Sequence, residues 1–187
     1  MITNLFTKSL VPKVLLAVLF CCSLALASDA RYSEPKYQES HTATQEFVSG
    51  GTLRVRMSVG DIRITRGTSN QIHLNYTISS RSESRLKEAR VNFEVHGNEA
   101  SLEFHAPTSA NTQFEVELEV PENTRLDVHE KVGDLTVEKI DGDKDLELSV
   151  GDIRVTDEHP SYRYVQASTS IGDVSGDGYG EIGRAHV

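Results

Sequence analysis

Apolar and polar residues alternate along most of the chain from Thr52 onward, a pattern typical of β-strands with one buried face. The strongest regular run is 114–120, where apolar residues alternate with three glutamates that form an acidic outer stripe. The same alternation recurs at 53–59, 72–78, 91–95 and 146–150. Glycine, proline and asparagine separate these runs, as expected for turns. The sequence therefore predicts an all-β domain.

One segment breaks this rhythm. Residues 79–90 are polar on almost every side, and only Leu86 and Ala89 recur at helical spacing. Mixed-charge runs of this kind are usually solvated. We therefore expect a short surface helix or a loop insertion near 80–90.

A tetrapeptide with an apolar residue on either side of Gly-Asp organises the C-terminal half. It occurs at 132–135, 150–153 and 171–174, and once far upstream at 59–62. The tandem steps are 18 and 21 residues, enough for two short strands and two turns, which suits one coil of a β-solenoid whose coils stack in parallel. The predicted shared interior consists of Val132, Leu135, Val137, Leu146, Leu148, Val150, Ile153, Val155 and Ile171.

The N-terminal half is expected to be a β-sheet layer that continues or caps this β-helix-like solenoid. An antiparallel sandwich is the competing architecture, because each Gly-Asp pair could instead turn a hairpin.

The recurrent glycine and aspartate have a structural explanation. Glycine adopts positive φ at a sharp corner without a Cβ penalty, and an adjacent aspartate can accept hydrogen bonds from backbone amides. The alternative is a calcium-binding module in which Asp134, Asp152 and Asp173 form a carboxylate ladder. The known calcium-binding β-roll repeat is a nonapeptide, about half the spacing found here. We therefore favour structural turns and assign no metal ligands and no cofactor.

The composition divides the chain into four segments. Residues 1–27 combine Lys8 and Lys13, a 13-residue apolar run and Ala25-Leu26-Ala27, which predicts a signal peptide cleaved after Ala27; a retained anchor or a lipoprotein modified at Cys21 or Cys22 is the alternative. Residues 28–50 form a polar lead-in or tether, and 51–180 form the repeat domain. Residues 181–187 do not continue the repeat and are expected to be a non-native read-through tail, so that the domain is truncated and further coils are missing.

Charge and cysteine content limit the classes of partner and the kinds of covalent or metal site that the protein could have. The formal charge is −9, and Cys21 and Cys22, the only cysteines, both lie in the predicted signal. The exported part would therefore have no disulfide and no thiolate metal site. An acidic surface disfavours nucleic acid, and no stable membrane span is expected after signal cleavage. The last coil would present an open edge that invites edge-to-edge self-association.

The sequence offers little support for catalysis. The seven histidines are scattered, and none has the short helical spacing of a zinc site. Three of them, His73, His96 and His105, fall opposite the apolar phase of their strands and are expected to face solvent. A glycan-processing enzyme remains the least favoured alternative, because it needs a cleft with two suitably spaced carboxylates. We therefore expect a non-enzyme and name no catalytic residues.

The segment Val120-Pro121-Glu122-Asn123-Thr124-Arg125-Leu126-Asp127-Val128, followed by the Gly-Asp coils, resembles the bacterial "putative adhesin" family of Gly-Asp β-strand-repeat domains of unknown function. The resemblance covers about Thr52 to Gly180. It implies a β-solenoid at the cell envelope with no established catalytic residues. The expected function is that of an exported, non-catalytic protein of the periplasm or cell surface, which presents a binding or scaffolding surface to an envelope or extracellular macromolecule.

Overall fold

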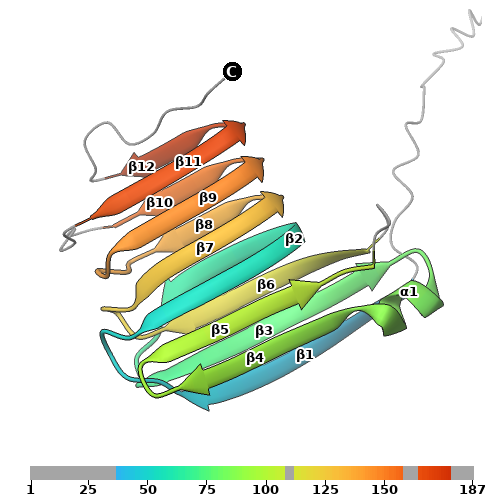
Figure 1. Ribbon diagram of the computed structural model, residues 1–187, viewed down its shortest axis with the longest axis horizontal. Coiled ribbons are helices and arrows are strands. Elements are labelled where there is room, and N and C mark those ends of the chain that lie inside the picture. The colour runs from blue at the N-terminus through green and yellow to red at the C-terminus, as the bar shows by residue number, and fades with distance from the viewer. Residues whose placement is uncertain (1–36, 108–111, 158–163, 178–187) are drawn as a thin grey trace, which may run out of the picture. The chain divides into compact units, whose positions relative to one another are not determined.

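The structure is a computed structural model that describes residues 37–107, 112–157 and 164–177 (Figure 1). The predicted signal peptide 1–27, the start of the lead-in and the predicted tail 181–187 lie outside these residues. The prediction of an all-β domain is confirmed, with a single short helix in the described part. The elements are β1 (Tyr37–Glu46), β2 (Thr52–Arg66), β3 (Gln71–Ser80), α1 (Glu83–Glu88), β4 (Arg90–His96), β5 (Glu99–His105), β6 (Thr112–Val120), β7 (Arg125–Val132), β8 (Leu135–Glu138), β9 (Lys144–Val150), β10 (Ile153–Thr156), β11 (Val165–Ile171) and β12 (Val174–Asp177).

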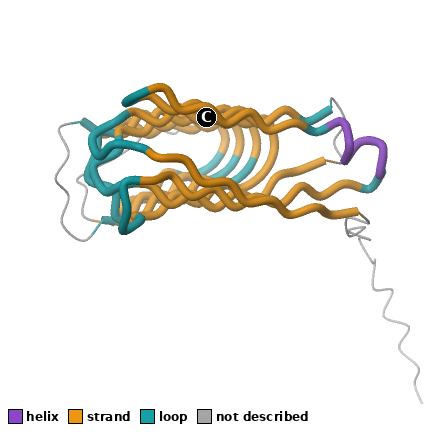
Figure 2. Tube along the Cα trace, turned by 90° about the horizontal axis from the view of Figure 1, so that it is seen from below, coloured by secondary structure: helices purple, strands orange, loops and turns teal. Residues whose placement is uncertain are grey.

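The long strand β2 is the centre of the sheet topology. It bends at Gly60, so its first half pairs in parallel with β5 and β7 and its second half with β6 and β8. The strands thus form one mixed sheet folded into two layers, which Figure 2 shows from the edge with arcs of chain joining them. We call the layer of β4, β5, the first half of β2, β7, β9 and β11 layer I. Layer II contains β1, β3, β6, the second half of β2, β8, β10 and β12.

The Gly-Asp repeats stack as parallel coils. Each coil consists of a strand in layer I, a Gly-Asp corner and a strand in layer II: β7–β8, β9–β10 and β11–β12. In layer I, Val128 aligns with Leu146 and then Ala167, so the coils lie in register. Hairpins at the Gly-Asp pairs, as the antiparallel sandwich requires, are therefore not formed. Antiparallel pairing is found instead between β1 and β3, β3 and β6, and β4 and β5.

Glycine is required at the corners for two reasons. The corner glycines have positive φ, for example +149° at Gly133 and +130° at Gly151. In addition, Gly133, Gly151 and Gly172 each pack against the backbone of the preceding corner glycine. A Cβ on Gly133 would lie 1.5 Å from the carbonyl oxygen of Gly60, and a Cβ on Gly151 would lie 1.7 Å from that of Gly133. Close stacking of the coils thus leaves no room for a side chain.

The interior lies between the two layers. Six of the nine predicted interior residues are buried there: Leu135, Val137, Leu146, Leu148, Ile153 and Val155. The prediction was wrong for Val132, Val150 and Ile171, which are 44%, 39% and 67% exposed. These three residues do lie one above the next, but each directly precedes a corner glycine. There the chain leaves layer I and bends toward layer II (Figure 2).

Two N-terminal segments also bear on the predictions. The insertion near 80–90 contains the helix α1, whose Leu86 is buried. The lead-in expected over 28–50 is not an unpaired tether where it is described, because β1 pairs with β3 along its full length. Most β1 side chains are exposed, and the strand is held by backbone hydrogen bonds, by cross-strand side-chain hydrogen bonds such as Thr42 to Asn75, and by the buried Phe47 that follows it. An edge strand of this kind carries no apolar alternation that sequence analysis could detect.

Candidate binding surface on layer I

The outer side of layer I carries charged side chains in rows that cross the strands. Register aligns Arg54 of β2 with Asp127 of β7, and Asp127 with Asp145 of β9. The next row aligns Arg56 with His129, which in turn aligns with Glu147. Arg54 and Asp127 are cross-strand neighbours of opposite charge and attract one another, whereas Asp127 and Asp145 are like charges that do not support the pairing. We call this surface the charged face; it comprises Arg54, Arg56, Glu99, Glu103, Arg125, Asp127, His129, Asp143, Asp145 and Glu147.

Asp127 is the centre of the charged face. Its Oδ1 lies 3.0 Å from Nη1 of Arg56 and 3.1 Å from Nε2 of His129, and its Oδ2 lies 3.8 Å from Nε of Arg54. Arg56 also donates a hydrogen bond to the backbone carbonyl of Asp127 over 3.1 Å. This carboxylate therefore holds two guanidinium groups and one imidazole at defined positions.

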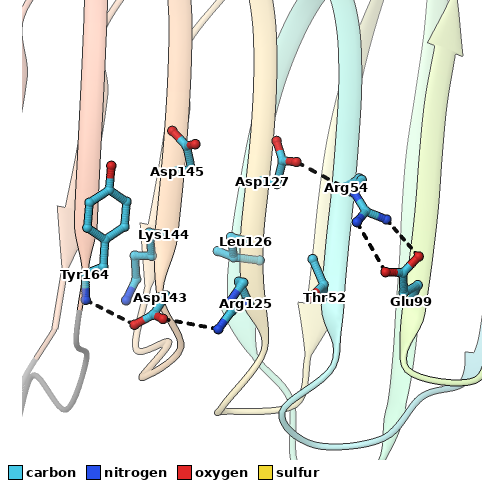
Figure 3. Close-up of a pocket in the computed structure, with 10 residues that line it drawn as sticks. All are labelled: Thr52, Arg54, Glu99, Arg125, Leu126, Asp127, Asp143, Lys144, Asp145 and Tyr164. Carbon is cyan, nitrogen blue, oxygen red and sulfur yellow. Dashed lines mark hydrogen bonds and ion pairs between the residues drawn. The ribbon is translucent and has the colours of Figure 1, made fainter.

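Arg54 is held from its other side by Glu99 of β5. Its two terminal nitrogens donate to the two Glu99 carboxylate oxygens over 3.1 and 3.3 Å, a bidentate geometry that fixes the guanidinium plane (Figure 3). This contact keeps the pKa of Glu99 below its usual value. The exposed pair contributes little to stability, since solvent screens it. Its effect is to orient the arginine on the surface.

An open depression of about 510 Å³ lies on the charged face across β5, β2, β7 and β9 (Figure 3). At one end, Asp143 accepts hydrogen bonds from Nη2 of Arg125 over 3.4 Å and from the amide of Tyr164 over 3.1 Å. Asp145 has no hydrogen-bond or ion-pair partner among the described residues. The depression therefore presents a half-exposed tyrosine ring and a carboxylate that is available to a ligand.

A second depression of about 450 Å³ adjoins it toward the corners. His129 contacts Glu147 there over 2.9 Å, and His105 contacts Glu103 over 3.3 Å. Solvent exposure of His96 and His105 agrees with the sequence prediction, and His73 is half-buried. Within the described ranges, no three His, Cys, Asp or Glu side chains are arranged so that they could hold a metal ion.

The three aspartates considered as calcium ligands do form a ladder, but its contacts are to the backbone. Oδ1 of Asp134 accepts a hydrogen bond from the amide of Asp152 over 3.0 Å, and Oδ1 of Asp152 accepts one from the amide of Asp173 over 2.8 Å. The same contact joins Asp61 to Asp134. The aspartates thus close the corners from one coil to the next, which is the structural role considered in the sequence analysis.

Glu130 and Lys144 are buried ionisable residues that the sequence analysis missed. Glu130 is only 3% exposed, and neither carboxylate oxygen has a hydrogen-bond partner in the described part of the chain. Burial, followed by the charges of Asp61 and Asp134, raises the pKa of Glu130 to about 8. Lys144 is also buried, and its Nζ donates a hydrogen bond to the carbonyl of Gly142 over 3.0 Å. Burial lowers the pKa of Lys144.

The strand phase could have indicated both residues. Glu130 follows Leu126 and Val128 at intervals of two, and Lys144 precedes Leu146 and Leu148 in the same way. Each residue therefore occupies an inward-facing position of its strand, although a charged residue type would normally predict a solvent-facing side chain.

The family model described as Toastrack DUF4097 matches residues 50–180 of the chain. The chain therefore belongs to this family, and the resemblance of its Val-Pro segment and Gly-Asp coils to the adhesin-like repeat domains is confirmed. No curated protein matches the chain.

One solved structure supports the fold, and two others are less similar. A putative cell adhesion protein from Clostridium sporogenes has 15% sequence identity and a TM-score of 0.57, with 75% of this chain and 72% of that chain covered. A putative adhesin from Bacteroides fragilis is 12% identical over 73% of this chain and 79% of its own, with a TM-score of 0.32. A putative lipid binding protein from Parabacteroides distasonis is 11% identical over 74% and 67%, with a TM-score of 0.34. In the described part of this chain, no helix has the length and apolar character needed to cross a membrane.

Proposed function

We propose that the protein is an exported, non-catalytic, adhesin-like protein of the bacterial cell envelope that binds an envelope or extracellular macromolecule through the charged face. It would act in the periplasm or at the cell surface. The observation that carries this proposal is the arrangement around Asp127, where ion pairs position charged groups beside two open depressions. Preorganised surface charges of this kind favour recognition, because the side chains lose little freedom when a ligand binds.

We also propose that the stacked coils are part of a β-solenoid. In-register parallel pairing of β7, β9 and β11 in layer I, and of β8, β10 and β12 in layer II, supports this architecture. A stack of coils forms an extended surface, so it suits an extended ligand better than a small one.

The chemistry of the face indicates which ligand would bind. Arg54 and Arg56 are already neutralised by neighbouring carboxylates, whereas Asp145 is not paired in the described part. With a formal charge of −9, the protein attracts cationic groups at long range. We therefore propose a polymer that carries amino groups, which would contact Asp145 in the larger depression.

Co-sedimentation of the purified full chain with isolated bacterial envelopes tests this proposal. Asp145→Lys reverses the available charge without breaking an existing ion pair, and Glu117→Lys makes the same change at an exposed position of layer II. We expect Asp145→Lys to lower retention by about fivefold or more, as truncation of a central contact does, with Glu117→Lys close to wild type. Equal retention of the two variants, or no retention of the wild type, would contradict binding through the charged face.

Export is tested separately. The full chain and a version without residues 1–27 would be expressed in the same bacterial host and followed by cell fractionation and N-terminal sequencing. We expect only the full chain to reach the periplasm or surface, with Ser28 as its new N-terminus. A full chain that stays in the cytoplasm with Met1 intact would contradict export.

A further inference from the structure

An exposed apolar stripe crosses the coils at their corners. Val132, Val150 and Ile171 are all well exposed, and backbone register places Val150 next to both of the others. The half-buried Val59 of β2 extends the stripe, because it aligns with Val132. Adjacent strands lie about 4.8 Å apart, so these side chains form a continuous row along the stack. A soluble domain rarely leaves such a row uncovered without a binding role.

A row of carboxylates runs beside the stripe, on the other side of each corner glycine. It consists of the exposed side chains of Asp61, Asp134, Asp152 and Asp173. In the first three, Oδ1 accepts an amide hydrogen of the next coil, and Oδ2 makes no hydrogen bond or ion pair within the described residues. No lysine or arginine of the described part lies within ion-pair distance of any of the four.

Like charges one strand apart repel one another even in water. The ladder is therefore a site where cationic side chains of a partner gain electrostatic energy that the chain itself does not supply. We call the apolar stripe and the aspartate ladder together the corner ridge; it comprises Val59, Val132, Val150, Ile171, Asp61, Asp134, Asp152 and Asp173.

We propose that the corner ridge is a docking site for a basic amphipathic helix of another protein, which lies along the stack with its apolar side chains on the stripe and its lysines or arginines on the aspartate ladder. The site is distinct from the charged face, which lies on the outer side of layer I. Its partner is therefore independent of the polymer proposed above.

Geometry and charge select this partner. Successive turns of an α-helix repeat every 5.4 Å, close to the spacing of about 4.8 Å between coils, so one apolar residue per turn can follow the stripe. Side chains on one face of an extended strand repeat at about 6.7 Å and would drift out of step. A second copy of this chain is disfavoured, because it would bring two aspartate ladders together on a molecule with a formal charge of −9.

Fluorescence anisotropy with the full chain and a labelled model peptide tests the proposal. The probe is a helical peptide of leucine and lysine of about 14 residues, long enough to span four coils, with leucine on one face. A scrambled peptide of the same composition is the control probe. We expect the amphipathic peptide to bind about tenfold or more tightly than the scrambled one, because only it places both side-chain types in register.

Two ridge variants and two matched controls complete the design. Val132→Ser with Val150→Ser removes the centre of the stripe, and Asp134→Asn with Asp152→Asn removes charge but keeps the oxygen that accepts the backbone amide. The controls are Val48→Ser, at a residue that is 50% exposed, and Glu117→Gln on layer II. All four changes are at surface positions, and thermal unfolding would verify that the fold is kept.

We expect each ridge variant to weaken peptide binding by about fivefold or more and each control by less than about twofold. Equal binding of the amphipathic and scrambled peptides would show attraction by net charge alone and would overturn the proposal. A wild-type dimer in sedimentation experiments that Val132→Ser with Val150→Ser dissociates would also overturn it, since the ridge would then be a self-association surface.

Discussion

The backbone amide of Asp134 donates a hydrogen bond to the side-chain Oδ1 of Asp61 over 3.1 Å, although the two residues are 73 positions apart. Identical contacts then join Asp134 to Asp152 and Asp152 to Asp173 within the tandem repeats. The isolated motif in β2 is therefore the first member of the stack. The strands and the helix between β2 and β7 in the sequence do not interrupt the hydrogen-bonded series of corners.

This ladder predicts opposite effects for two substitutions of Asp134. Asp134→Ala removes the acceptor for the Asp152 amide and should lower the free energy of unfolding by about 1–2 kcal/mol. Asp134→Asn keeps an acceptor oxygen and removes a charge between two like charges, so it should be as stable as the wild type or slightly more stable. Urea unfolding of the full chain measures both, and equal destabilisation by the two substitutions would contradict the hydrogen-bond role.

The control is Asp145→Ala, since Asp145 is an exposed aspartate one coil along with no partner in the described part. It should change the free energy of unfolding by less than about 0.5 kcal/mol. Calcium gives a further comparison. If the ladder serves the backbone, calcium should raise the melting temperature no more than sodium chloride of equal ionic strength, and a larger rise that Asp134→Asn abolishes would favour a cation site.

The corners and most of the core could be predicted because both follow from local chemistry. A glycine with positive φ beside an aspartate is a strong turn signal, and alternation assigned residues such as Leu146 and Leu148 correctly to the interior. Alternation failed at Val132 and Val150, since a period of two continues the strand past the point where the chain bends. The position along the strand at which the interior ends depends on the opposite layer. The local sequence does not encode that position.

The charged face could not be assembled from the sequence for a related reason. Arg54, Glu99 and Asp127 belong to three strands, and only the pairing of β2 with both β5 and β7 brings them together. Each residue alone is an ordinary charged position on the outer phase of a strand. Tertiary register, which the sequence analysis did not specify for this half, determines which charges become neighbours.

A comparison of two glycines separates backbone strain from steric exclusion. Both Gly133 and Gly97 have positive φ, but a Cβ on Gly133 would meet Gly60 at 1.5 Å whereas a Cβ on Gly97 has nothing within 4 Å. Gly97→Ala should therefore cost about 1–2 kcal/mol from the backbone conformation alone. Gly133→Ala should cost more than about 4 kcal/mol and prevent stacking of the coils.

Chemical unfolding followed by circular dichroism would compare these two variants. If Gly133→Ala fails to fold, Gly97→Ala still reports the backbone contribution, and Gly133→Ala should appear as insoluble or protease-sensitive protein. Similar stabilities for the two variants would show that the coils do not pack as closely as the structure indicates.

Two valines in β7 test where the interior ends. Val128 is fully buried between the layers, whereas Val132 is 44% exposed at the corner. Val128→Ala should lower the free energy of unfolding by about 2 kcal/mol, because it removes buried apolar atoms and leaves a cavity. Val132→Ala should change it by less than about 0.5 kcal/mol. Thermal or urea unfolding would distinguish the two variants. A comparable loss in the free energy of unfolding for both would indicate that Val132 belongs to the interior.

Glu130 should make stability depend on pH. It lies in register between Met57 and Leu148, two apolar neighbours in the interior. Its pKa is raised from 4.5 to about 8 in the folded state. The folded protein therefore retains a proton that the unfolded chain releases, and stability falls as the pH rises from about 4.5 to 8. Below about pH 4.5 Glu130 is protonated in both the folded and the unfolded state. Above about pH 8 it is ionised in both states, so the loss of stability is then complete.

Comparison of the wild type with Glu130→Gln isolates this effect, because glutamine has a similar shape and does not titrate. The wild type should lose a few kcal/mol more than Glu130→Gln between pH 5 and pH 8.5, since each unit of pKa shift corresponds to about 1.4 kcal/mol. The stabilities of the two proteins should differ less at pH 5 than at pH 8.5. Urea unfolding at each pH measures the difference, and parallel pH profiles would mean that Glu130 is not buried as a neutral acid.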